Sequence, residues 1–146
     1  MKITICGSIA FFEDMLIIKD KLEKLGHKVD LPPTKILNDK DEYIPVTEYY
    51  NLRKSEKPPA WVWVAKKKAM LAHFNKVEWA DIILVVNQEK NGVAGYIGAN
   101  TLMEMGLALF LKKPIYLLNE IPEISYREEI EGMSPMLING DLSKIA

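Results

Sequence analysis

The stretch that decides the fold begins with the apolar segment Asp81-Ile-Ile-Leu-Val-Val86 and continues through Asn91-Gly-Val-Ala-Gly-Tyr-Ile-Gly98 into Ala99–Ala108. The first segment has the length and aliphatic composition of a buried strand, the second is a glycine-rich loop, and the third is typical of a helix. Another aliphatic segment, Pro114–Leu118, follows. The order strand, loop, helix, strand predicts a parallel β-α-β unit.

The same alternation extends toward both ends of the chain. Gly26 follows a helical pattern, which is typical of the residue just past a helix C-terminus. We predict an α/β fold with a doubly wound, mostly parallel five-stranded sheet of the flavodoxin-like kind. Residues 32–59 are rich in proline and charge, which predicts an irregular, lid-like excursion within a single domain spanning residues 1–146. The remaining expected elements are strands at Lys2–Cys6, His27–Leu31 and Met136–Ile138, and helices at Asp14–Leu25 and Ala60–Trp79.

Composition narrows the classes of function. The 146 residues carry a formal net charge of −1, so no overall basic field predicts nucleic-acid binding. The single cysteine, Cys6, excludes an intramolecular disulfide and a multi-cysteine metal site, and we expect a buried thiol. No signal peptide and no apolar segment of membrane-spanning length is visible, which favours a cytoplasmic protein with no membrane partner. We expect neither a metal nor a cofactor.

Glu104 is the one charged residue between Lys90 and Lys112. One explanation is a capping box over Thr101–Glu104, in which the glutamate reaches back to an amide at the helix start. The other begins from the helix, which is apolar on every side and is therefore expected to be buried. A buried carboxylate must be hydrogen-bonded or face a cavity, and open α/β sheets place ligands beyond the carboxyl ends of their strands. The residues alone leave both explanations open.

Three motifs resemble one enzyme superfamily. Glu104-Met-Gly-Leu-Ala108, after its glycine loop, looks like the nucleophile helix of the nucleoside 2-deoxyribosyltransferase family. Ile5-Cys-Gly-Ser-Ile9 is similar to the start of the 2'-deoxynucleoside 5'-monophosphate N-glycosidases of that superfamily, and Gly132–Leu137 resembles a late segment of those hydrolases. The resemblance implies an enzyme that cleaves or transfers the N-glycosidic bond of a (2'-deoxy)nucleoside or nucleoside 5'-monophosphate. It also implies a homo-oligomer, a dimer or larger, with sites between subunits.

The resemblance further implies how such a reaction would use the chain. Ionised Glu104 would attack the anomeric carbon, giving a covalent glycosyl-enzyme that water or a second base resolves. His73 falls on or near the family's base-contacting aspartate and is a candidate general acid, because histidine titrates near neutrality. A partly exposed structural histidine is the alternative for that position. The expected substrate-binding residues are Gly7, Ser8, Ile9, Asn91, Gly92, Tyr96 and, from a neighbouring subunit, Ser134.

This chain departs from the family in ways that keep other functions open. Ala10-Phe11-Phe12 stands where the hydrolases carry a phosphate-binding arginine, which favours an uncharged nucleoside at least as much as a nucleotide. Asn91 stands where the transferases hold an aspartate. A non-catalytic nucleotide-binding or sensing domain is one alternative. The segment Gly98–Glu104 also resembles the ribonucleoside-monophosphate phosphoribohydrolases, which gives a second alternative.

Overall fold

Five parallel strands form the main sheet of the computed structural model, which describes residues 1–145. Their spatial order is β2-β1-β5-β6-β7, which is the flavodoxin-like order when the strands of this sheet alone are counted. Every pairing between neighbours is parallel. The predicted fold class and all five predicted strands are therefore confirmed. The strands are β1 (Lys2–Cys6), β2 (Lys28–Asp30), β5 (Ile82–Val85), β6 (Ile115–Leu117) and β7 (Met136–Leu137).

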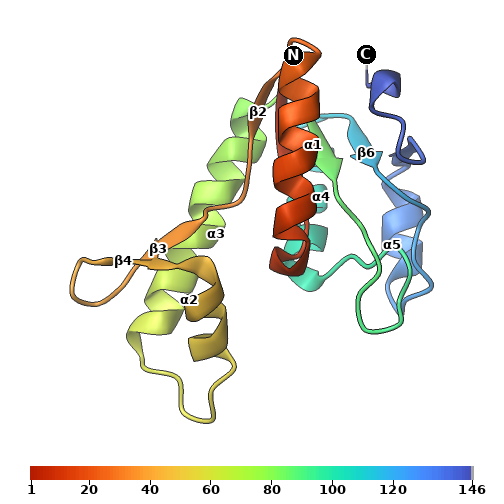
Figure 1. Ribbon diagram of the computed structural model, residues 1–146. Helices are drawn as coiled ribbons and strands as arrows, with labels where there is room; N and C mark the ends of the chain where they lie inside the picture. Colours follow the sequence, from red (N-terminus) through yellow and green to blue (C-terminus); the bar gives the residue numbers. More distant parts are fainter. Residues whose placement is uncertain (146) are drawn as a thin grey trace. The chain divides into compact units, whose positions relative to one another are not determined.

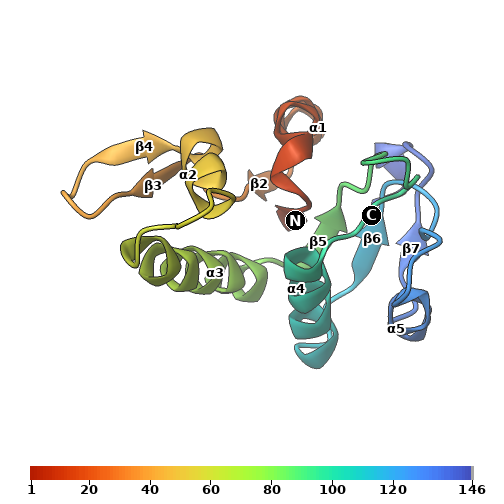
Figure 2. The same ribbon diagram turned by 90° about the horizontal axis from the view of Figure 1, so that it is seen from below.

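Helices cover both faces of this sheet. α1 (Phe12–Lys24) packs on one face, while α4 (Ala99–Phe110) and α5 (Arg127–Gly132) pack on the other, as Figure 2 shows. Alternate residues of the strands face the two layers, so Ile3 and Ile5 contribute to the first apolar cluster and Cys6 to the second. Two short 3-10 helices, η1 (Ile9–Phe11) and η2 (Leu142–Lys144), complete this part.

The chain divides into two compact units. The first consists of residues 1–31 and 76–146 and contains the main sheet, and the second consists of residues 32–75 (Figure 1). α3 (Trp61–Trp79), which confirms the predicted Ala60–Trp79 helix, begins in the second unit and ends in the first. The single-domain organisation stays a prediction, which a single cooperative unfolding transition by two probes would support.

Residues 32–59 are more regular than the sequence predicted, although a role as a lid stays a prediction. They form an antiparallel hairpin of β3 (Lys35–Leu37) and β4 (Tyr43–Pro45), followed by α2 (Val46–Arg53). Asn38 closes the hairpin, because its side-chain oxygen accepts from the amides of Lys40 and Glu42, both at 2.9 Å. Tyr49 is buried in a separate apolar cluster and donates its hydroxyl to the Val62 carbonyl at 2.7 Å. Local turn chemistry and one buried aromatic residue order the segment.

The outward face of α4 is apolar and exposed, which corrects the expectation that this helix is buried all round. Thr101, Glu104, Met105 and Ala108 are buried, but Met103, Leu109 and Phe110 are not. The exposed fraction of Phe110 is 81%, an unusual value for an aromatic residue. Among the described residues, no helix is both long and apolar enough to cross a membrane.

Candidate active site

Glu104 lies on the buried face of α4, with an exposed fraction of 2%. Gly98 is the N-cap of α4, so Glu104 belongs to the second turn of the helix. Asn100, one turn earlier, donates from Nδ2 to Oε1 of Glu104 at 3.0 Å. A capping box starting at Thr101 is therefore wrong, because the helix begins before that residue and the glutamate contacts a side chain.

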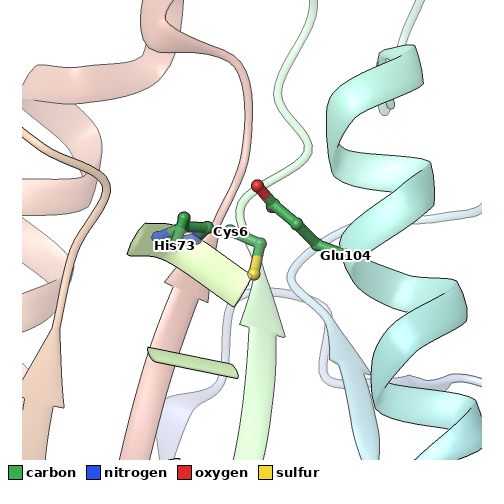
Figure 3. Close-up of side chains that lie close together, drawn as sticks. All are labelled: Cys6, His73 and Glu104. Atoms are coloured by element: carbon green, nitrogen blue, oxygen red, sulfur yellow. The ribbon is translucent and has the colours of Figure 1, made fainter. Parts of the chain in front are cut away.

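Cys6, the last residue of β1, lies beside this carboxylate. Its Sγ and the Glu104 carboxylate oxygen are within 4.8 Å of each other, and the thiol is hydrogen-bonded to Glu104. Figure 3 shows the Glu104 side chain leaving α4 toward the end of β1. Burial raises the pKa of the Cys6 thiol well above its ordinary value, and the negative Glu104 raises it further. A protonated thiol donates a weak hydrogen bond, so Cys6 and Asn100 both present neutral donors to Glu104.

Cys6 is expected to resist iodoacetamide in the folded protein and to react fully after unfolding, because the thiolate is the reactive form and the side chain is fully buried.

The same thiol should make stability depend on pH. Above the ordinary thiol pKa of 9.0, the unfolded chain loses the thiol proton of Cys6 while the folded chain keeps it. The free energy of unfolding should therefore fall as the pH rises above that value. Mass spectrometry after timed alkylation and thermal melts at alkaline pH would check both. Cys6→Val is the control that lacks both effects, and rapid labelling of the folded protein would contradict the prediction.

The turn after β1 places Gly7 and Ser8 at the same edge of the sheet. A side chain at Gly7 would meet the Val86 carbonyl oxygen at 2.8 Å, so the adjacent strand requires glycine there. The Ser8 hydroxyl accepts from the Ala10 amide at 3.3 Å and from Lys90 Nζ at 3.1 Å. Ile9, also expected to bind substrate, begins η1 directly after this turn.

The glycine-rich loop after β5 lies at this edge as well. It contains a tight turn between Lys90 and Val93, with φ of 52° at Asn91 and 79° at Gly92, a conformation that suits asparagine and glycine. Tyr96 is half-buried, and its ring centroid lies 5.0 Å from Lys90 Nζ. These contacts bring the predicted residues of the loop to the edge where Ser8 lies.

Asn87 fastens the loop to the segment that follows β6. Its Nδ2 donates to the carbonyls of Gly95, Asn119 and Glu120 at 3.3, 3.1 and 3.0 Å, and its Oδ1 accepts from the Asn119 amide at 2.9 Å. Asn87 is fully buried. Gly95 has φ of 69°, and a side chain there would meet the Glu120 oxygen at 2.4 Å, so the backbones approach as closely as glycine allows.

One predicted residue of the first unit, Ser134, stands apart from this edge. Ser134 is exposed and comes two residues before β7, at the amino end of that strand. Since the strands are parallel, it lies at the opposite edge and does not join the site of its own chain. His73, the third side chain labelled in Figure 3, is a residue of α3 in the second unit. It is buried, so the alternative expectation of a partly exposed histidine was wrong.

Sequence reasoning missed four of these residues. The contacts of Cys6 and Lys90 join positions far apart in the chain, and no local pattern indicates them. Asn87 did carry a signal, because a polar residue directly after an aliphatic strand reaches the ligand-binding edge of a parallel sheet. Asn100 stands one helical turn before Glu104, a spacing that brings side chains into contact once the helix start is known.

Comparison with known proteins supports this architecture through structure alone. The sequence matches no family profile and no curated protein. Among solved structures, a 2-deoxyribosyltransferase from Bacillus psychrosaccharolyticus has a TM-score of 0.50 at 18% identity, over 80% of this chain and 71% of that chain. A CMP N-glycosidase from Clostridium botulinum has a TM-score of 0.45 at 14% identity, over 94% and 85%. A conserved protein from Enterococcus faecalis V583 has a TM-score of 0.48 at 17% identity, over 80% and 62%. The chain thus shares the fold of the 2-deoxyribosyltransferase from Bacillus psychrosaccharolyticus.

Proposed function

We propose that this protein cleaves or transfers the N-glycosidic bond of a (2'-deoxy)nucleoside or nucleoside 5'-monophosphate, with Glu104 as the nucleophile. The observation that carries the proposal is a buried carboxylate held by neutral donors, Asn100 and Cys6, at the strand edge where this fold class binds ligands. Such donors fix the direction of a carboxylate without neutralising it. A glutamate that only capped the helix would lie at the helix start. Glu104 lies in the second turn of α4, so helix capping does not explain its position.

The proposed reaction is a double displacement. A Glu104 oxygen forms a bond to C1' of the sugar while the bond from C1' to the base nitrogen breaks, and the base leaves with that electron pair and takes a proton. Water or a second base then attacks C1' and gives up a proton to the group that protonated the first base, while the bond from C1' to the Glu104 oxygen breaks and leaves a carboxylate. We retain His73 as the proposed donor of the proton to the base, because an imidazole can carry a proton near neutral pH.

The proposed substrate contacts divide along the sheet edge. Gly7, Ser8 and Ile9 would contact the sugar end, since they follow β1 directly. Asn91, Gly92 and Tyr96 would contact the base, the first through its amide and Tyr96 by stacking. These assignments rest on the loop geometry described above and on the motif resemblance.

A homo-oligomer is part of the proposal, because Ser134 lies away from the site of its own chain and would act in a neighbouring one. The exposed apolar face of α4, with Met103, Leu109 and Phe110, is suited to burial against another copy. Light scattering would test this, and a monomer mass at micromolar concentration would contradict it.

Base release is the direct test. The protein is incubated with deoxyribonucleosides, ribonucleosides and their 5'-monophosphates, each with and without a second free base, and the bases are separated by chromatography. Release of base, or exchange into the second base, supports the proposal and distinguishes hydrolysis from transfer. Binding of these compounds with no release from any of them would favour a non-catalytic sensing domain. Cleavage of ribonucleoside monophosphates alone would favour a phosphoribohydrolase.

A further inference from the structure

Asn100 has an amide oxygen that the fold does not use. Its Nδ2 donates to Oε1 of Glu104 at 3.0 Å. Its Oδ1 is buried and accepts no hydrogen bond from the part of the chain that the structure describes. The reverse orientation of the amide would turn Oδ1 toward the carboxylate, where two acceptors would repel each other. Ionised Glu104 therefore determines which amide atom of Asn100 is left over, and that atom is an acceptor.

A buried acceptor without a donor lowers the stability of the folded chain, because it has given up its hydrogen bonds to water. Such groups are rare in folded proteins, and each one calls for an explanation. Asn87, by contrast, uses both atoms of its amide within the fold. Asn100 as a whole is half-buried, so its side chain lies at the boundary between the interior and solvent. Its oxygen is thus suited to a donor that a ligand brings.

The segment around Asn100 carries the other groups of the proposed site. Asn100 lies in the first turn of α4, directly after the glycine-rich loop. A side chain at Gly98, the N-cap, would meet the Tyr96 ring at 3.3 Å, so that ring lies against the start of the helix. The unused oxygen therefore belongs to the same short segment as the proposed base contact, Tyr96, and the proposed nucleophile, Glu104.

The position of the reacting carbon decides which substrate group can meet this oxygen. In the proposed reaction an oxygen of Glu104 bonds to C1', and Asn100 already contacts that carboxylate. Next to C1', the ring oxygen O4' is only an acceptor and the base is the leaving group, so a hydroxyl on C2' is the one donor. In a β-ribonucleoside this hydroxyl projects from the ring face opposite the base, which is the face that the nucleophile approaches. A ribose therefore turns its 2'-hydroxyl toward Glu104 and Asn100.

We propose that Asn100 Oδ1 accepts a hydrogen bond from the 2'-hydroxyl of the substrate, so that the protein prefers ribose substrates to their 2'-deoxy counterparts. This rests on the proposed function, whose substrate class it narrows. The 2'-hydroxyl satisfies the buried acceptor, whereas a 2'-deoxy sugar leaves it without a donor. The other end of the amide keeps its hydrogen bond to Glu104, so one side chain aligns the nucleophile and recognises the sugar.

The test compares the binding of sugar analogues by calorimetry, in a Glu104→Gln background that prevents turnover. Each nucleoside and 5'-monophosphate is used with hydroxyl, hydrogen or fluorine at the ribose position of C2'. Fluorine is close to the hydroxyl in size and polarity but cannot donate a hydrogen bond. The 2'-hydroxyl compound should bind about 10- to 100-fold more tightly than the 2'-deoxy compound, and the 2'-fluoro compound should bind as weakly as the 2'-deoxy one.

Replacing Asn100 by alanine in the same background should reduce the preference for ribose to less than about threefold. Asn100→Ala also removes the donor to the side chain at position 104, but that loss affects all three analogues alike, so the ratio of their affinities isolates Oδ1. Asn51→Ala, at an exposed position on α2, is the control and should keep the full preference. Circular dichroism melts establish that each variant is folded. If Asn100→Ala does not fold, the three analogues still decide the question in the parent protein.

The outcomes separate this inference from the proposed reaction. Equal binding of the 2'-hydroxyl and 2'-deoxy compounds, tight binding of the 2'-fluoro compound, or an unchanged preference in a folded Asn100→Ala protein would overturn the role of Asn100. Base release by the wild type with no preference for ribose would support the reaction and remove this role. A preference that depends on Asn100, in a protein that releases no base, would do the reverse. Binding of none of the compounds would contradict both.

Discussion

Replacing Glu104 by glutamine is expected to lower kcat for base release about 1,000-fold or more, with a much smaller change in KM. The amide has the shape of the carboxylate but cannot form the ester to C1'. Its oxygen can still accept from Asn100 Nδ2, so the helix and the neighbouring thiol need not move. Single-turnover kinetics would measure the loss. Mass spectrometry of quenched wild-type protein should detect the glycosyl adduct on the peptide that contains Glu104, and the variant should lack it.

Thermal stability provides an independent check on the same variant. A buried carboxylate is costly to desolvate, so Glu104→Gln should melt at the temperature of the wild type or above it. Lost activity with unchanged or raised stability assigns the loss to chemistry rather than to unfolding. Glu128→Gln, an exposed position on α5, removes the same charge and should change neither activity nor stability. If Glu104→Gln retained more than about one tenth of kcat, the covalent mechanism would be wrong.

β5 and β6 of the main sheet could be predicted because each is an unbroken apolar run. Ile82–Val85 and Ile115–Leu117 are buried along their whole length, as strands covered on both faces are. Gly26, with φ of 92°, ends the first helix region as its position suggested. In these elements local composition and tertiary burial favour the same structure, so the pattern alone was sufficient.

The remaining features depended on contacts that the sequence does not display. The hairpin at 35–45 forms around the Asn38 side chain in a stretch whose prolines and charges suggested a loop. α4 begins at Ala99 because Gly98 is extended, with ψ of 174°, whereas the Thr101–Glu104 pattern suggested a later start. That shift of a few residues changes Glu104 from a capping group into a side chain facing Cys6. Lys90 and Ser8 are 82 positions apart, so their hydrogen bond became visible only in the fold.

Replacing Asn87 by aspartate is expected to lower the free energy of unfolding by about 3 kcal/mol or more, and Asn87→Ala by somewhat less. In the wild type one buried amide group donates to three backbone carbonyls and accepts from one backbone amide. Aspartate has the same size but turns an oxygen toward those carbonyls, which combines a buried charge with repulsion between acceptors. Alanine leaves the backbone groups without a partner but adds no charge. Urea unfolding curves would show whether Asn87→Asp is less stable than Asn87→Ala.

The pH dependence of Asn87→Asp distinguishes this explanation from a general packing defect. Carbonyl oxygens around a buried carboxyl favour its protonated form, so the folded variant should hold a proton that the unfolded chain loses above about pH 4. The stability deficit should therefore grow as the pH rises from 5 to 8 and shrink on acidification, when the carboxyl can donate to a carbonyl in place of the lost amide. Asn87→Ala should show no such trend, and Asn139→Asp, at an exposed position, should show neither the deficit nor the trend. A deficit in Asn87→Asp that is independent of pH would mean that no buried carboxyl titrates at this position, and it would contradict this explanation. The loop that carries Lys90 and Tyr96 would then be held by the close approach of Gly95 to Glu120 rather than by this amide.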